Sequence, residues 1–192
     1  SKSVPLAQTR SRFEQDYDRI IFSHPFRKLQ DKTQVFPMPE DDFVHSRLTH
    51  SLEVASVGRS LAKEVGKIIL SKNEALRASG IKYQDFGDVV SAACLAHDLG
   101  NPPFGHSGEQ SISSFFLNTE GGQFFESMVK PTEWSDLINF EGNAQGFRIL
   151  TNPNQGGLSL TYSTLATFTK YPLSSASKKV PARQSQHKYG FF

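Results

Sequence analysis

An apolar run that closes on a histidine and an aspartate, followed at once by a Gly-Asn-Pro-Pro turn, constrains this chain more than any other feature. Residues 88–98 are rich in Val, Ala and Leu and predict a buried helix, which Gly100 is expected to end as its C′ residue. Burying His97 and Asp98 there without partners would be costly. Their position therefore favours a ligand role over the capping or surface pair that an isolated His-Asp dipeptide usually is.

Apolar residues recur at helical spacing along most of the chain, and we expect an all-α fold. The clearest helix covers about 47–70, with Ser46 as its N-cap. Residues 72–87 are polar and turn-like, and the alternation of β-branched and polar residues over 158–164 allows a short strand. Further helices are expected over 13–22 and 26–34, from near 107 onward, and over 124–129 and 141–150.

Composition narrows the class of protein. A length of 192 residues fits one ordinary domain, and the net charge of +2 gives no argument for nucleic acid as a partner of the whole chain. No apolar run approaches the ~18–20 residues of a membrane span, and no signal peptide is visible. The single Cys94 allows no disulfide within one chain. We therefore expect a cytoplasmic protein with no membrane partner.

The C-terminal part of the chain is basic. Five Lys or Arg residues and no acid lie between positions 170 and 188. We expect residues 173–192 to form a basic flexible loop, either a solvated tail or an arm that meets the phosphates of nucleotides or nucleic acid. The chain stops at Phe192 without a polar tail, so we expect residues 1–192 to be part of a larger all-helical protein.

Three side chains are candidate metal ligands. His50 begins the helix expected over 47–70, and its distance in sequence from His97 and Asp98 suits two neighbouring antiparallel helices. Mixed imidazole and carboxylate ligation suits Mn²⁺, Fe²⁺, Ni²⁺ or Zn²⁺ better than Ca²⁺, and Mg²⁺ is acceptable where phosphate supplies ligands. We therefore expect a divalent metal, Mn²⁺, Mg²⁺ or another transition metal, as cofactor.

A second group of residues carries acid/base chemistry. His106 and Glu109 are three residues apart and would share a helix face, where a carboxylate fixes the imidazole tautomer and raises its basicity. Such a pair can activate a water that attacks phosphorus or protonate the leaving oxygen; a helix-capping Glu beside a surface His is the alternative. Arg47, three residues before His50, could clamp phosphate oxygens beside the metal or be an ordinary surface arginine.

Long segments resemble a known family, the HD-domain deoxynucleoside triphosphate triphosphohydrolases, and within it the dGTPase-like group. The similar residues are 47–54 (RLTHSLEV), 96–109 (AHDLGNPPFGHSGE) and 140–148 (FEGNAQGFR), with 13–20 and 29–37 in addition. The resemblance covers about residues 10–192. It implies an HD-domain helical bundle, of which 1–192 would be a truncated HD-type domain. It also implies a divalent metal, an oligomer that is often a hexamer, and hydrolysis of dNTP, with dGTP the expected substrate, to deoxynucleoside and intact triphosphate.

The resemblance also implies roles for individual residues. His106 and Glu109 are catalytic near the α-phosphate, Arg47 grips phosphate, and Gln34 contacts the deoxyribose. Two further residues, Asn143 and Gln145, are expected to donate amide hydrogen bonds to the substrate, although a helix-start role for residues 141–143 is equally reasonable. The family's fourth metal ligand is a distal aspartate that matches no carboxylate after Glu109 in this chain.

Two other functions remain as alternatives. The chain could be another HD phosphohydrolase that acts on nucleoside monophosphates or signalling nucleotides. It could also be a non-catalytic nucleotide or single-stranded DNA binder that uses the basic residues 170–188, and either a nucleotide or single-stranded DNA could be an effector of the enzyme. The acid/base pair argues against a purely binding role.

Overall fold

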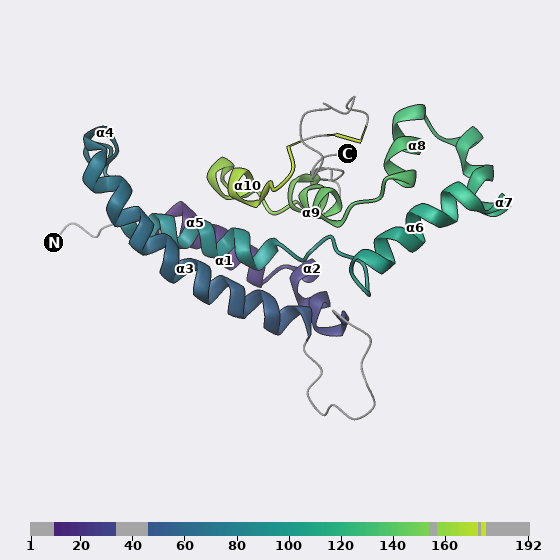
Figure 1. The fold of residues 1–192 in the computed structure, drawn as a ribbon. Helices are drawn as coiled ribbons and strands as arrows, with labels where there is room; N and C mark the ends of the chain where they lie inside the picture. The colour runs from purple at the N-terminus through teal and green to yellow at the C-terminus, as the bar shows by residue number, and fades with distance from the viewer. Residues whose placement is uncertain (1–9, 34–45, 154–156, 173, 176–192) are drawn as a thin grey trace.

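The computed structural model describes residues 10–33, 46–153, 157–172 and 174–175. Within these ranges the named elements are all helices, Thr33 and Ser46 form an isolated β-bridge, and the expected all-α fold is confirmed (Figure 1). None of the described helices is long and apolar enough to cross a membrane. The elements are α1 (Arg12–Ile21), α2 (His24–Arg27), η2 (Lys28–Asp31), α3 (Arg47–Lys72), α4 (Glu74–Ala78), α5 (Tyr83–Ala96), α6 (His106–Asn118), α7 (Glu120–Gln123), η3 (Phe124–Met128), α8 (Pro131–Ile138), α9 (Gly142–Thr151) and α10 (Tyr162–Phe168).

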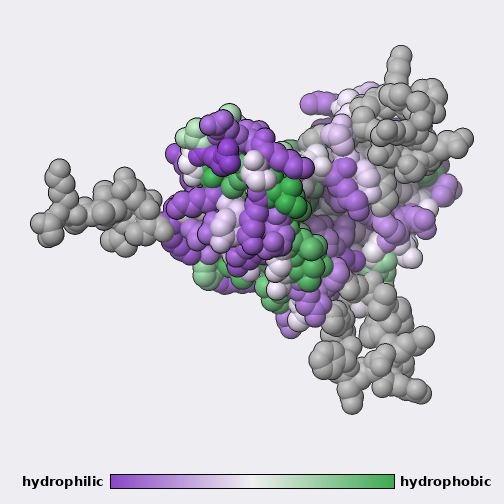
Figure 2. Space-filling model, turned by 60° about the vertical axis from the view of Figure 1, so that its left-hand side comes forward, coloured by the Kyte–Doolittle hydropathy of each residue, from purple (hydrophilic) through white to green (hydrophobic). Residues whose placement is uncertain are grey.

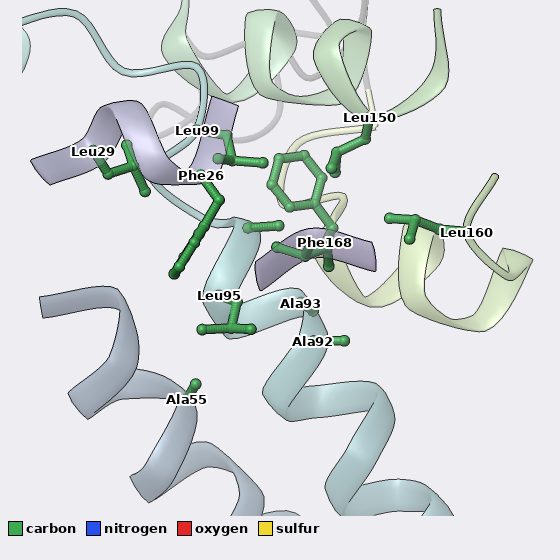
Figure 3. Close-up of a cluster of buried hydrophobic side chains, with 12 residues drawn as sticks. Phe26, Leu29, Ala55, Ala92, Ala93, Leu95, Leu99, Leu150, Leu160 and Phe168 are labelled. Atoms are coloured by element: carbon green, nitrogen blue, oxygen red, sulfur yellow. The ribbon is translucent and has the colours of Figure 1, made fainter. Parts of the chain in front are cut away.

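A central pair of helices, α3 and α5, organises the molecule. They run side by side over most of their length, and α1 and α10 pack against α5 (Figure 1). Small residues on α5 let these neighbours approach, and Leu95 at its C-terminal end is fully buried. Figure 3 shows the core where these elements meet, made of side chains that are at most 9% exposed: Ile20, Phe26, Leu29, Ala55, Ala92, Ala93, Leu95, Ala96, Leu99, Leu150, Leu160 and Phe168.

Local sequence explains where several of the helices begin. Ser11 and Glu14 form a capping box at the start of α1, in which each side chain binds the other's backbone N–H. The Ser46 hydroxyl accepts from the Thr49 N–H and caps α3, as the sequence predicts. Thr161 caps α10 in the same way by accepting from the Thr164 N–H.

Helices α6 to α8 project from the central helices as an arm (Figure 1). The arm begins at a sharp bend, where Phe104 has φ of +65° and Gly105 has φ of +56° immediately before α6. Such a bend suits glycine at its second position, because a side chain there would be strained. Figure 2 shows hydrophilic side chains over much of the visible surface, interrupted by separate hydrophobic patches.

Three expectations about local structure are wrong or incomplete. The possible strand at 158–164 is absent: residues 158–161 form an irregular segment in which Ser159 has φ of +51°, and residues 162–164 begin α10. The polar region 72–87 contains the short helix α4 and the first turn of α5. Helix α5 ends at Ala96, and Gly100 is not among the described residues with positive φ, so it does not terminate the helix as a left-handed residue. Of the expected loop 173–192, all but residues 174–175 lie outside the described ranges.

Gly100 has a different role, because two backbones touch at this position. A Cβ atom added to Gly100 would lie 2.0 Å from the Gly142 carbonyl oxygen and 2.1 Å from the Gly146 nitrogen, both in α9. Only glycine leaves room for α9 to pack directly on the turn that follows α5. The close approach fixes the start of α9 against the segment that carries His97 and Asp98.

Replacing Gly100 by alanine should therefore destabilise the fold by about 1–3 kcal/mol or more, since backbone atoms must shift to admit the methyl group. Gly121→Ala in α7 is the matched control: its Cβ would meet nothing closer than 3.9 Å, so stability should hardly change. Denaturant unfolding of both variants measures the difference. Equal stability of the two variants would contradict the packing described for Gly100.

Candidate metal centre and acid/base pair

Three ligand-type side chains converge where the start of α3 meets the end of α5. His50 lies in the first turn of α3, His97 is the C-cap of α5, and Asp98 follows it. One ligand atom from each of the three residues lies within 4.8 Å of the other two. The two imidazole rings meet edge to face with their centres 5.2 Å apart. The structure therefore brings together the three residues that the sequence predicts to be metal ligands.

Hydrogen bonding fixes which nitrogen of His97 faces this cluster. The Nδ1 atom lies 2.7 Å from the carbonyl oxygen of Cys94, one turn earlier in α5. Because a carbonyl oxygen can only accept, Nδ1 carries the proton and the lone pair is on Nε2. Nε2 lies 3.4 Å from Asp98 Oδ1, so the nitrogen that can ligate a metal is the one that faces the aspartate.

Asp98 is buried and held from two sides. Its Oδ1 atom accepts from Asn101 Nδ2 at 2.6 Å, and its Oδ2 atom lies 3.0 Å from Arg47 Nη1. Among the described residues, no donor makes a well-aligned hydrogen bond to Oδ2. A buried carboxylate oxygen with spare acceptor capacity, next to two imidazoles, fits a divalent transition metal. The donor set alone does not select one metal ion.

Two cations surround this carboxylate. Arg47 has a side chain that is only 5% exposed, and its Nη2 atom donates to the Pro102 carbonyl oxygen at 3.5 Å. Lys32 donates from Nζ to the Asn101 carbonyl oxygen at 3.2 Å. Burial, and then the positive charge of Arg47, lower the pKa of Lys32. The site therefore concentrates positive charge beside the three ligands, which favours anionic groups there.

The acid/base pair is formed at the start of α6. His106 Nδ1 lies 2.7 Å from Glu109 Oε2, and the other carboxylate oxygen, Oε1, accepts from the Gly142 N–H at 2.8 Å. Gly142 is the first residue of α9, so the N–H that holds the Glu109 carboxylate lies at the positive end of that helix dipole. The Glu109 carboxylate accepts from Nδ1–H and sets the tautomer of His106. Glu109 is buried, whereas the His106 side chain is 73% exposed.

Both groups open onto one cavity of about 370 Å³. Its walls come from α3, from the turn after α5, from α6 and α9, and from the segment that ends α10. Asp98 of the ligand cluster and the His106–Glu109 pair therefore face the same space. The lining residues are Arg47, His97, Asp98, Asn101, Gly105, His106, Glu109, Asn143, Phe168 and Lys170.

Comparison with known proteins identifies this arrangement. The sequence pattern of the HD domain matches residues 47–141, which include the three ligands and the acid/base pair. The chain belongs to the HD-domain family. Within this family, the chain is 50% identical over 197 residues to a deoxyguanosinetriphosphate triphosphohydrolase-like protein of Synechocystis sp.. It is 49% identical over 187 residues to a protein of the same name from Pseudomonas aeruginosa, and 40% identical over 184 residues to the deoxyguanosinetriphosphate triphosphohydrolase of Yersinia enterocolitica.

The similarity covers most of this HD-domain chain but less than half of each relative. The alignment with the Synechocystis protein spans 95% of this chain and 43% of that protein. The alignment with the Pseudomonas protein spans 95% of this chain and 41% of that protein, and the alignment with the Yersinia enzyme spans 83% of this chain and 36% of that enzyme. The predicted resemblance to the dGTPase-like HD proteins is confirmed over this length.

The structure places the remaining predicted substrate residues as follows. Asn143 lines the cavity from α9, and its Nδ2 atom donates to Glu141 Oε1 at 2.5 Å. Gln145 lies two residues further along α9 and is not among the described residues that line the cavity. Gln34 lies outside the described residues. Its expected contact with a deoxyribose stays a prediction.

Three residues of the HD site are not on the list of candidates from the sequence. Lys170 and Phe168 line the cavity from the end of α10, and Asn101 holds Asp98. The sequence places Lys170 only within the basic stretch 170–188, because nothing local predicts that α10 packs back onto α5. Asn101 could have been found, since an amide three residues after the aspartate is within reach of it in a tight turn.

Proposed function

We propose that the protein containing this HD domain is a metal-dependent hydrolase that converts a dNTP, with dGTP as the expected substrate, to deoxynucleoside and inorganic triphosphate. The strongest support for this proposal is that His97 and Asp98 of the ligand cluster line the same cavity as the His106–Glu109 pair. The names of the relatives point to the same reaction. The expected location is the cytoplasm.

His50, His97 and Asp98 are the residues that would hold the metal. A divalent cation bound there would supply Lewis-acid stabilisation of the charge that develops on a phosphate oxygen. The protein's own contribution is to orient these ligands. The Cys94 carbonyl oxygen fixes the His97 tautomer, and Asn101 fixes the Asp98 carboxylate.

His106 is proposed to move the proton. Glu109 accepts from Nδ1–H of His106, so Nε2 is the ring nitrogen that exchanges a proton with water or substrate. Attack of water on the α-phosphorus breaks its bond to the 5′-oxygen of the deoxyribose. The water oxygen then stays with the triphosphate, and a proton is delivered to the 5′-oxygen of the nucleoside.

The cations on the cavity wall suit the triphosphate. Arg47 pairs with Asp98, and Lys170 reaches the cavity from the opposite element, α10. Both can offset negative charge on phosphate oxygens, and Arg47 is held by its ion pair before substrate binds. Asn143 and Gln145 remain proposed amide donors, and Gln34 a proposed deoxyribose contact.

Product analysis of the full-length protein tests the proposed reaction. With dGTP and Mn²⁺ or Mg²⁺, we expect release of inorganic tripolyphosphate and deoxyguanosine, and none without a divalent metal. In H₂¹⁸O the label should enter the tripolyphosphate and not the nucleoside. Release of pyrophosphate or orthophosphate would overturn this function and favour another HD phosphohydrolase reaction.

The partners are proposals of the same kind. We propose a homo-oligomer, with a hexamer as the expected form, and a nucleotide or single-stranded DNA as possible effector classes. Light scattering of the full-length protein, with and without these ligands, measures the assembly.

A further inference from the structure

The most completely buried charge in the described chain lies outside the site. Asp16 of α1 has no exposed surface. Its Oδ2 atom accepts three hydrogen bonds, from the Thr161 N–H at 2.9 Å, from Thr161 Oγ1 at 2.6 Å and from Thr164 Oγ1 at 2.8 Å. Arg19 lies on the other carboxylate oxygen at 3.5 Å. A carboxylate buried this deeply persists only because these donors replace its hydration.

These hydrogen bonds join two segments that are far apart in sequence. Asp16 belongs to α1, whereas Thr161 and Thr164 form the N-cap and first turn of α10. Arg19 adds a second link by donating to the Ser159 carbonyl oxygen at 2.6 Å. We name the Asp16 carboxylate with Thr161 and Thr164 the α1–α10 latch. It sets where α10 begins on the surface of α1.

The other end of α10 forms a wall of the cavity. Phe168 is 8% exposed and faces Leu99 and Leu150 in the core (Figure 3). A Cβ atom on Gly146 would lie 2.8 Å from the Phe168 ring, so this ring lies directly on α9. Lys170 follows two residues later and lines the cavity. Because α10 is only seven residues long, fixing its first turn also fixes the direction in which its last turn points.

We infer that Asp16 is a positioning residue for substrate binding: through the α1–α10 latch it holds Lys170 where it can meet the phosphates of the substrate. The inference rests on the proposed function for the identity of that substrate. Asp16 touches neither the ligand cluster nor the acid/base pair in any described contact. Its effect should therefore appear in the binding of polyphosphate and not in the binding of metal.

Binding of inorganic tripolyphosphate to the full-length protein, measured by calorimetry in Mn²⁺, tests this role without requiring turnover. Asp16→Ala should weaken binding about tenfold, the loss expected when one charged hydrogen-bonding group is misplaced. Asp16→Asn, which keeps an acceptor oxygen, should recover part of the affinity. Mn²⁺ affinity should be the same in all three proteins.

Thr164→Val provides a second variant if Asp16→Ala fails to fold. It keeps the shape of a fully buried side chain and removes one donor to Asp16. We expect a smaller loss of tripolyphosphate affinity in the same direction. Ser11→Ala is the matched control, because it weakens the cap of α1 at the other end and so lowers stability without touching the latch.

A double-mutant cycle separates positioning from general stability. If Asp16 acts through Lys170, the double variant Asp16→Ala/Lys170→Ala should bind tripolyphosphate as weakly as Lys170→Ala alone. Full additivity of the two effects would overturn the inference, as would unchanged affinity in Asp16→Ala or Thr164→Val. A wild-type protein that binds tripolyphosphate but does not release it from dGTP would instead overturn the proposed function and leave the latch result standing.

Discussion

Replacing His106 by alanine is expected to lower kcat for dNTP hydrolysis by about 10²–10⁴-fold, the range that a positioned general acid or base contributes. The imidazole is the part of the acid/base pair that opens to solvent, with its side chain 73% exposed, while Glu109 is buried behind it. Its removal therefore creates no core cavity, and the melting temperature should change little. The measurement is a steady-state assay of tripolyphosphate release by the full-length protein.

Metal binding provides the internal check on that result. His106 is not one of the three clustered ligands, so His106→Ala should bind Mn²⁺ with wild-type affinity. His24→Ala, which removes an exposed histidine of α2, is the matched control and should keep full activity. Wild-type turnover in His106→Ala would show that the pair has only a capping role.

Asp98→Ala is expected to abolish metal binding and to lower the free energy of unfolding. The carboxylate is one of the three ligands, and it is also the counter-charge of Arg47, which lies 3.0 Å away with a side chain only 5% exposed. Leaving a buried guanidinium without its partner typically costs about 3–5 kcal/mol. We expect no Mn²⁺ binding by calorimetry, no hydrolysis, and a loss of this size in the free energy of unfolding.

A double variant separates the loss of metal binding from the loss of stability. Arg47→Met/Asp98→Leu removes both charges together, so it should regain much of the stability that Asp98→Ala loses. It should still bind no Mn²⁺, because a ligand is missing. If Asp98→Ala binds Mn²⁺ like the wild type, the assignment of His50, His97 and Asp98 as the metal centre is wrong.

Much of the site could be predicted because its residues lie on regular elements with clear local signals. Ser46 marks the start of α3, so His50 is one turn into that helix, and the apolar run before His97 marks the end of α5. The spacing of His106 and Glu109 suffices to place both on one face of α6, and their side chains meet at 2.7 Å. Local capping and helical periodicity carry this information.

The α10 segment shows where local signals fail. Residues 158–164 alternate in the manner of a strand, yet Thr161 becomes a helix N-cap because Asp16 accepts from its N–H and hydroxyl. That partner is 145 residues away in sequence, so no window of neighbouring residues contains the deciding interaction. Local sequence does not predict that Lys170 lines the cavity for the same reason, since its position depends on where α10 packs.

The direct contact of Gly100 with α9 has a consequence for how the two halves of the site stay aligned. Most contacts between helices are made by side chains, which exchange between rotamers and lose conformational entropy when they are restricted to a single rotamer. At this contact, the main chain of Gly142, whose N–H holds Glu109, and of Gly146 lies directly against Gly100, two residues after Asp98, with no side chain between them. The backbone segments that carry Asp98 and the Gly142 N–H are therefore placed against each other by main-chain geometry, with no side-chain rotamers to order at this contact when a substrate arrives.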